Sequence, residues 1–168
     1  WSLASRLYLG LTAPLIPSYR HTILDENGSS RYPKEWRRTM NIEPVKVGIV
    51  GLGRWARVLT RAASQSDQIK VVAGYSRSEE KRQAFERELG VPAAPDLKTM
   101  LADPEIKGII ITVPNEQHLP VAAEGGGAGK HIYTEKPIAS TLEEGLEIAG
   151  LQEKFGVTVT VGHSARLM

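Results

Sequence analysis

The chain has 168 residues, a formal net charge of +2 and no cysteine. This length suffices for one domain with its own core, and the small charge gives no case for a nucleic-acid or membrane partner. The lack of cysteine excludes a disulfide framework and fits a reducing compartment, so we expect a cytoplasmic protein. Because no Cys/His cluster is present and no run approaches about 18 apolar residues, we expect neither a metal site nor a membrane span.

The first forty residues differ from the rest of the chain. Residues 1–17 are mildly apolar but irregular, and residues 25–39 are polar and rich in turn formers. A signal peptide is one alternative, but the apolar run lacks a charged n-region and is interrupted by prolines. We interpret residues 1–40 as an appended or disordered leader and residues 41–168 as the folded domain.

From residue 45 onward, β-branched apolar runs alternate with segments that have helical spacing. The apolar runs predict strands at 45–51, 69–76, 107–114, 130–135 and 157–163. Helices are predicted between them, with N-caps at Ser78, at Asp96 and at Ser140 or Thr141, and with Gly90 as a stop signal. This alternation predicts an α/β fold with a doubly wound parallel sheet.

The segment "EGGGAG" (124–129) interrupts this regular pattern where a helix should be finishing. Each glycine inside a helix costs about 0.8–1 kcal/mol relative to alanine. A loosened helix end and an error in the sequence are the two alternatives for this run.

The segment "GLGRWA" (51–56) follows the first strand and opens the first helix. Gly51 permits a tight turn, Gly53 leaves room for a pyrophosphate, and Ala56 lets the helix pack close to the strand. The helix N-terminus offers free N–H groups to the phosphates. Such a turn alone is a weak signal, but a strand before it and a helix after it favour a dinucleotide site over a purely structural turn.

The end of the second strand, "GYSRSEEK" (74–81), bears on which dinucleotide binds. NAD sites usually place an acidic residue there for the ribose 2′-OH, whereas NADP sites place basic groups nearby. Here Ser76 and Arg77 occupy the tip, and Lys81 lies one turn into the next helix. A solvated loop arginine is the alternative, but the planar donors of arginine suit a phosphate. The sequence favours NADP, with NAD possible.

Two further strands also end in polar residues, in "TVPNEQH" (112–118) and "GKHIYTEKP" (129–137). Ligands bind outside the carboxyl ends of the strands in open α/β sheets. Glu135 and Lys136 therefore predict a site at the edge that carries the glycine turn, although a solvated loop is the alternative.

With these four motifs in this order, residues 41–168 resemble the glucose–fructose oxidoreductase and inositol dehydrogenase family (Gfo/Idh/MocA). The resemblance implies a Rossmann domain that binds NADP or NAD, and an enzyme that moves a hydride to or from a hydroxyl-bearing carbon of a sugar, cyclitol or similar polyol. The family's second, C-terminal α/β domain is absent from these 168 residues, so we expect the chain to be inactive alone. We expect the parent enzyme to be a homo-oligomer. A non-catalytic dinucleotide-binding module or sensor subunit is the alternative.

The resemblance also implies roles for single residues. Lys136 would lie at the nicotinamide and the substrate as the catalytic residue, donating to the substrate hydroxyl and stabilising an oxyanion. Two looser matches are His163 and Arg166, which would lie near the substrate. As a lone histidine, His118 is expected only to support the cofactor site. The predicted cofactor-binding residues are Gly51, Leu52, Gly53, Arg54, Trp55, Ala56, Ser76, Arg77, Lys81, Thr112, Pro114, Asn115, His118, Glu135 and Lys136.

Overall fold

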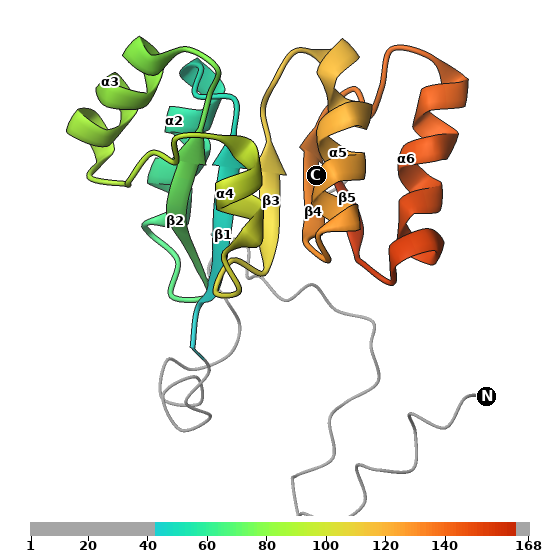
Figure 1. Ribbon diagram of the computed structural model, residues 1–168, viewed down its shortest axis with the longest axis horizontal. Helices are drawn as coiled ribbons and strands as arrows, with labels where there is room; N and C mark the ends of the chain where they lie inside the picture. The colour runs from blue at the N-terminus through green and yellow to red at the C-terminus, as the bar shows by residue number, and fades with distance from the viewer. Residues whose placement is uncertain (1–42, 164–168) are drawn as a thin grey trace, which may run out of the picture. The chain divides into compact units, whose positions relative to one another are not determined.

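The structure, a computed structural model, describes residues 43–163 (Figure 1). The predicted leader, residues 1–40, and Arg166 lie outside these residues, so the domain boundary stays a prediction. The strands are β1 Val45–Val50, β2 Ile69–Tyr75, β3 Gly108–Ile111, β4 His131–Glu135 and β5 Val159–Gly162. They form one parallel sheet in the order β2-β1-β3-β4-β5. The predicted doubly wound α/β fold is confirmed.

Helices cover both faces of this sheet. They are α2 Arg54–Ala63, α3 Glu79–Leu89, α4 Leu97–Ala102, the 3-10 turn η2 Asn115–Gln117, α5 His118–Gly127 and α6 Leu142–Phe155. Successive side chains of β3 alternate between two cores, because strand residues point to opposite faces in turn. Ile110 packs with α2 and α3, whereas Ile109 and Ile111 pack with α4, α5 and α6. In Figure 1, α4 and α5 lie in front of the sheet. None of the helices within residues 43–163 is long and apolar enough to cross a membrane.

The helix caps follow the sequence signals closely. Ser78, Asp96 and Thr141 each accept a hydrogen bond from the backbone N–H three residues on, at 3.3, 2.7 and 3.2 Å. Gly90 ends α3 in the left-handed conformation. The strands predicted at 107–114 and 157–163 are shorter than expected, because apolar composition extends beyond the residues that pair with a neighbouring strand.

The glycine run forms the last residues of α5, so all three glycines lie within the helix. A Cβ on Gly125 would lie 2.5 Å from the side chain of Ile109, and one on Gly126 would lie 2.8 Å from the Phe155 ring. Real Cβ atoms do not approach other atoms so closely. The two glycines therefore let α5 pack tightly against the sheet and against α6.

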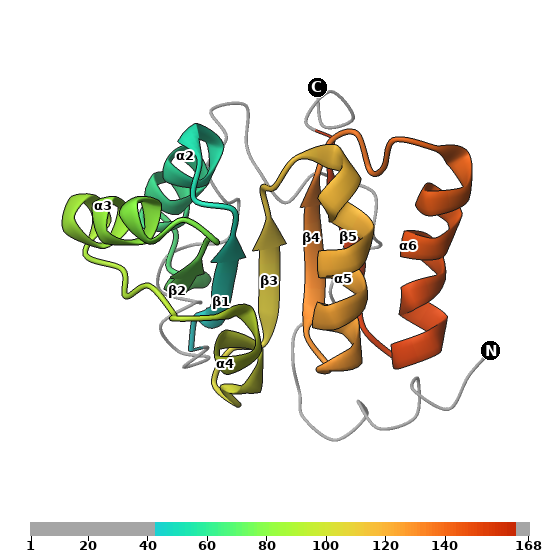
Figure 2. The same ribbon diagram turned by 45° about the horizontal axis from the view of Figure 1, so that its top comes forward.

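The strand register brings four strand ends to one edge of the sheet. Val50 pairs with both Tyr75 and Ile111, and Ile111 pairs with Thr134. Figure 2 shows β1, β3 and β4 running in the same direction toward this edge. From β1 the chain connects to β2 on one side, and it later continues to β3 on the other side. The topological switch point therefore lies between the carboxyl ends of β1 and β3. The residues that follow the four strand ends are Gly51, Ser76, Thr112 and Lys136.

Candidate functional site

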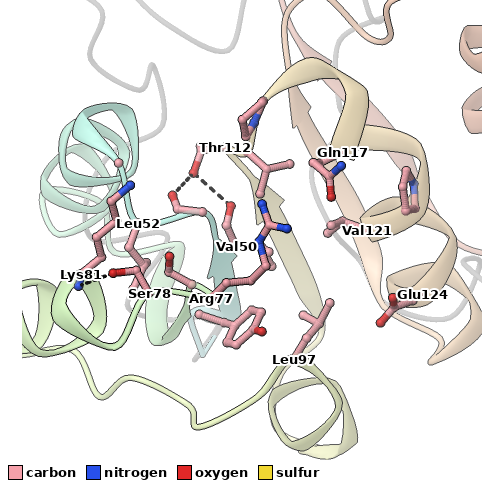
Figure 3. Close-up of a pocket in the computed structure, with 17 residues that line it drawn as sticks. Val50, Leu52, Arg77, Ser78, Lys81, Leu97, Thr112, Gln117, Val121 and Glu124 are labelled. Carbon is pink, nitrogen blue, oxygen red and sulfur yellow. Dashed lines mark hydrogen bonds between the residues drawn. The ribbon is translucent and has the colours of Figure 1, made fainter.

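A pocket of about 760 Å³, here called the main pocket, opens at this switch point (Figure 3). Its volume lies within the range of ordinary small-molecule sites. One wall comes from the end of β2 and the start of α3, and the other comes from the turn after β3 and from α5. The predicted site residues that line it are Gly51, Leu52, Gly53, Ser76, Arg77, Lys81, Thr112 and Pro114.

Gly51 and Gly53 are required for different reasons. Gly51 has a φ of 94°, and a Cβ there would lie 2.8 Å from the carbonyl carbon and oxygen of Thr112. The fold itself therefore demands glycine at this position. Gly53 has an extended backbone, and a Cβ there would meet no described atom within 4 Å. Space is open above the backbone of Gly53 on the wall of the main pocket, as a pyrophosphate requires.

The N-terminus of α2 is free to bind an anion. The N-cap of α2 is Gly53, which provides no side-chain cap, and the first turn of the helix contains no acidic residue. In contrast, α3, α4 and α6 each have a side-chain cap. The first N–H groups of a helix lack partners within the helix, and the helix dipole favours negative charge there. This helix end, the open space at Gly53 and the pocket together fit the phosphates of a dinucleotide.

Thr112 ties the end of β3 to the glycine turn. Its hydroxyl donates to the carbonyl oxygens of Val50, at 3.1 Å, and Gly51, at 2.7 Å (dashed lines in Figure 3). The predicted site residue Thr112 therefore also shapes the turn.

The wall at the end of β2 is basic. Arg77 extends into the middle of the main pocket in Figure 3, and Lys81 lines the same wall from α3. Ser78, the N-cap of α3, lies between them in the sequence and accepts a hydrogen bond from the Lys81 N–H. Glu124 is the one acidic residue that lines this pocket within the described part of the chain, and it comes from α5 on the opposite side.

Sequence reasoning missed the remaining wall of the main pocket. It comes from β2, α4, η2 and α5, and its residues are Tyr75, Leu97, Gln117, Pro120 and Val121. Most of them are apolar residues that read as ordinary core positions in the sequence. No local signal distinguishes them from the core.

Two arginines that sequence reasoning also missed contact the turns behind the main pocket. Arg57 Nη1 donates to the carbonyl oxygens of Leu52 and Gly53, both at 3.0 Å. Arg82 Nη1 donates to the carbonyl oxygen of Ser76 at 2.5 Å. Neither arginine lines the main pocket. Each lies four residues after a helix N-cap, which is a weak signal that the sequence does contain.

A smaller hollow of about 330 Å³, here called the second pocket, adjoins the main pocket. Thr112 and Val113 line both pockets. The predicted site residues Trp55, Thr112, Asn115, His118, Glu135 and Lys136 line the second pocket. The structure thus brings the glycine turn and the "TEKP" loop to neighbouring hollows.

His118 connects two loops of the second pocket. The residue is 1% exposed, and its ring nitrogens lie 3.1 Å from the Val113 carbonyl oxygen and 3.2 Å from the Ile138 carbonyl oxygen. It therefore links the turn after β3 to the loop that carries Lys136. Its role in supporting a cofactor site stays a prediction.

Glu135 has a partner on its own strand. Tyr133 Oη donates to Glu135 Oε1 at 3.4 Å. Burial raises the pKa of Tyr133, and the neighbouring carboxylate of Glu135 raises it further. The phenol therefore stays protonated and able to donate to this carboxylate at neutral pH.

Three residues singled out from the sequence do not line either pocket. Arg54 is exposed on the first turn of α2. Ala56 is fully buried against the sheet, where it allows the close helix packing predicted for it. His163 is exposed after β5. Within residues 43–163, no group of His, Cys, Asp and Glu is arranged to hold a metal ion.

Comparison with known proteins identifies the family of this chain. Residues 45–163 match the oxidoreductase family with an NAD-binding Rossmann fold, GFO_IDH_MocA. The chain therefore belongs to the Gfo/Idh/MocA oxidoreductase family, and the resemblance seen in the four motifs is confirmed.

Three relatives illustrate the range of the family. The 1,5-anhydro-D-fructose reductase of Ensifer adhaerens is 28% identical over 71% of this chain and 36% of its own length. An oxidoreductase from Desulfitobacterium hafniense DCB-2, described as NADPH-dependent, has a TM-score of 0.71 and 39% identity over 74% of this chain and 36% of its own. The scyllo-inositol dehydrogenase of Lactobacillus casei has a TM-score of 0.68 and 26% identity over 75% of this chain and 38% of its own. The chain spans about a third of the length of the curated relatives it matches.

Proposed function

We propose that this domain binds NADP and serves an oxidoreductase that acts on a hydroxyl-bearing carbon of a sugar, cyclitol or similar polyol. The observation that carries the proposal is the sharing of Thr112 and Val113 by the two pockets. An elongated ligand held by its phosphates at the glycine turn can therefore reach the hollow that contains Lys136.

The residues of the main pocket suit the pyrophosphate, the adenine and the 2′-phosphate of NADP. The α2 N-terminus and the space above Gly53 would take the pyrophosphate. The apolar wall, which includes Leu97 and Val121, would take the adenine. Ser76 and Arg77 would take the 2′-phosphate, because the guanidinium offers several fixed donors to phosphate oxygens. A relative described as NADPH-dependent supports the preference for NADP over NAD.

The second pocket suits a reacting centre. The nicotinamide cofactor supplies or accepts the hydride when it is bound. Lys136 would donate to the substrate oxygen, which carries negative charge as an alkoxide before a hydride leaves the carbon, or gains that charge when a hydride is added to a carbonyl. Trp55, 44% exposed on the same hollow, offers a flat apolar surface that limits where a ring can lie. Relatives named for 1,5-anhydro-D-fructose and scyllo-inositol support a polyol substrate.

Cofactor binding tests the first half of the proposal. Calorimetric titration should show NADP binding more tightly than NAD, and Arg77→Ala should remove most of the difference. Arg87→Ala is the matched control, since Arg87 is an exposed arginine in the last turn of α3 and lines neither pocket. Equal affinities for both dinucleotides, or an unchanged preference in Arg77→Ala, would contradict the assignment.

Kinetics of the full-length protein test the second half. Lys136→Ala should lower kcat by about 10²–10³ with a smaller change in KM, because a donor used mainly in the transition state is lost. Lys136→Arg should rescue only part of the rate. Lys98→Ala, which removes an exposed lysine outside both pockets, should leave kcat unchanged. Full activity of Lys136→Ala would show that a different group stabilises the reacting oxygen, whereas no turnover in the wild-type full-length protein would favour a non-catalytic binding module.

A further inference from the structure

The two helices that follow the cofactor turns share an arrangement that the proposed function does not use. Arg57 lies four residues after the N-cap Gly53 of α2, and Arg82 lies four residues after the N-cap Ser78 of α3. Each guanidinium folds back onto carbonyl oxygens of the turn that leads into its own helix. Arg82 Nη1 contacts Ser76 O at 2.5 Å and Arg77 O at 3.3 Å.

The contacts of Arg57 orient the peptide groups of the glycine turn. The N–H and C=O of a trans peptide point in opposite directions. When Arg57 Nη1 holds the carbonyl oxygens of Leu52 and Gly53, the N–H groups of Gly53 and Arg54 point the other way.

A carboxylate on α3 holds the Arg57 side chain in place. Arg57 Nε donates to Glu88 Oε2 at 2.6 Å, and Arg61 Nη2 donates to Glu88 Oε1 at 2.5 Å. The hydrogen bond from Arg57 lowers the pKa of Glu88, so this carboxylate is charged at neutral pH. The Arg57 side chain is 24% exposed and that of Arg61 is 60% exposed, so water screens the contacts of Arg57 less.

We propose that Arg57 is a positioning residue for the cofactor pyrophosphate and that Arg82 is the corresponding residue for the 2′-phosphate end. Neither lines the main pocket or the second pocket, whereas each contacts the backbone of its turn, through which it would act. The inference rests on the proposed binding of NADP. It adds two residues that set the geometry of the site without touching the ligand.

Arg61 provides a matched control for Arg57. Both arginines lie on α2, carry the same charge and pair with Glu88, but only Arg57 contacts the glycine turn. Arg57→Ala should weaken NADP binding about tenfold, which corresponds to about 1.4 kcal/mol. Arg61→Ala should change the affinity less than about twofold, because exposed ion pairs contribute little. Arg57→Lys should recover part of the affinity, since an ammonium lacks the planar fork that spans both carbonyls and Glu88.

Binding of a cofactor fragment distinguishes the role of Arg57 from that of Arg82. The probe 2′-AMP carries the 2′-phosphate but no pyrophosphate, so Arg57→Ala should leave its affinity unchanged and Arg82→Ala should weaken it. Arg87→Ala serves as the charge control on α3. A merely structural role would weaken NADP and 2′-AMP equally in each variant, which would overturn the proposal. Equal NADP affinities in Arg57→Ala and Arg61→Ala would also overturn it.

A readout without ligand distinguishes failure of this inference from failure of the proposed function. NMR order parameters of the Gly53 and Arg54 amides should fall in Arg57→Ala and not in Arg61→Ala. Unchanged order parameters would overturn the inference whichever cofactor binds. If the wild-type protein prefers NAD, the proposed cofactor preference is wrong. The test of Arg57 then compares ADP-ribose, which contains a pyrophosphate, with adenosine, which does not. If the protein binds neither dinucleotide, the proposed function and the positioning role both fail.

Discussion

The two glycines of the turn should respond in opposite ways to the same substitution. Gly53→Ala places a methyl group where no described atom lies within 4 Å, on an extended backbone that any residue adopts. Gly51→Ala places a methyl group 2.8 Å from the Thr112 carbonyl, on a backbone with a φ of 94°. We expect Gly53→Ala to fold but bind cofactor poorly, and Gly51→Ala to lose stability.

The structure sets the magnitudes. For Gly51→Ala, the positive φ costs about 1–2 kcal/mol and the crowding about 1–3 kcal/mol, together about 2–5 kcal/mol. At about 4 °C per kcal/mol, the Tm should fall by roughly 8–20 °C. Gly53→Ala loses only a favourable N-cap residue, about 0.5–1 kcal/mol or roughly 2–4 °C. A methyl group crowding the pyrophosphate by about 1–3 kcal/mol weakens NADP roughly tenfold to hundredfold.

Thermal unfolding and calorimetric titration of both variants measure these effects. The essential result is that Gly53→Ala combines a nearly normal Tm with a large loss of NADP affinity. Wild-type affinity in Gly53→Ala would refute the placement of the pyrophosphate above Gly53. An unchanged Tm in Gly51→Ala would refute the close contact between the glycine turn and the end of β3.

Three further predictions concern stability. Gly125→Ala should destabilise the fold by about 1–3 kcal/mol through crowding, whereas Gly127→Ala, whose Cβ would have its nearest neighbour at 3.9 Å, should stabilise the helix by up to about 1 kcal/mol in denaturant unfolding. Thr112→Val should cost about 1 kcal/mol by removing the hydroxyl that donates to the glycine turn, and an unchanged midpoint would contradict this. Lys130 Nζ donates to the carbonyl oxygens of two residues in the connection between α4 and β3, and burial lowers the pKa of this lysine. Between the lowered pKa and the ordinary value of 10.5, the unfolded state therefore binds more protons than the folded state. The contribution of Lys130 to the free energy of unfolding should therefore increase with pH between these two pKa values. Unfolding of Lys130→Met, measured over the same pH range, should lack this increase.

The sequence by itself determined the local structure and the identity of the family. Strand and helix periodicity, together with Ser78 and Thr141 as caps, express backbone preferences that act within a few residues, so they can be recognised without the fold. The "GLGRWA" turn is also local, because a strand, a tight turn and a helix N-terminus are consecutive in the chain. The same reasoning overestimated β3, because apolar composition does not show where strand pairing stops.

Only the tertiary structure decided which distant residues meet. Gly51 must be glycine partly because Thr112, 61 residues later, passes against it. Gly125 must be small because α5 lies directly on Ile109, so a run that looks unfavourable in an isolated helix is required by packing. Arg57 contacts the glycine turn because Glu88, 31 residues away on α3, holds its guanidinium. These contacts depend on strand order and helix packing, which are properties of the whole chain and leave no local pattern in the sequence.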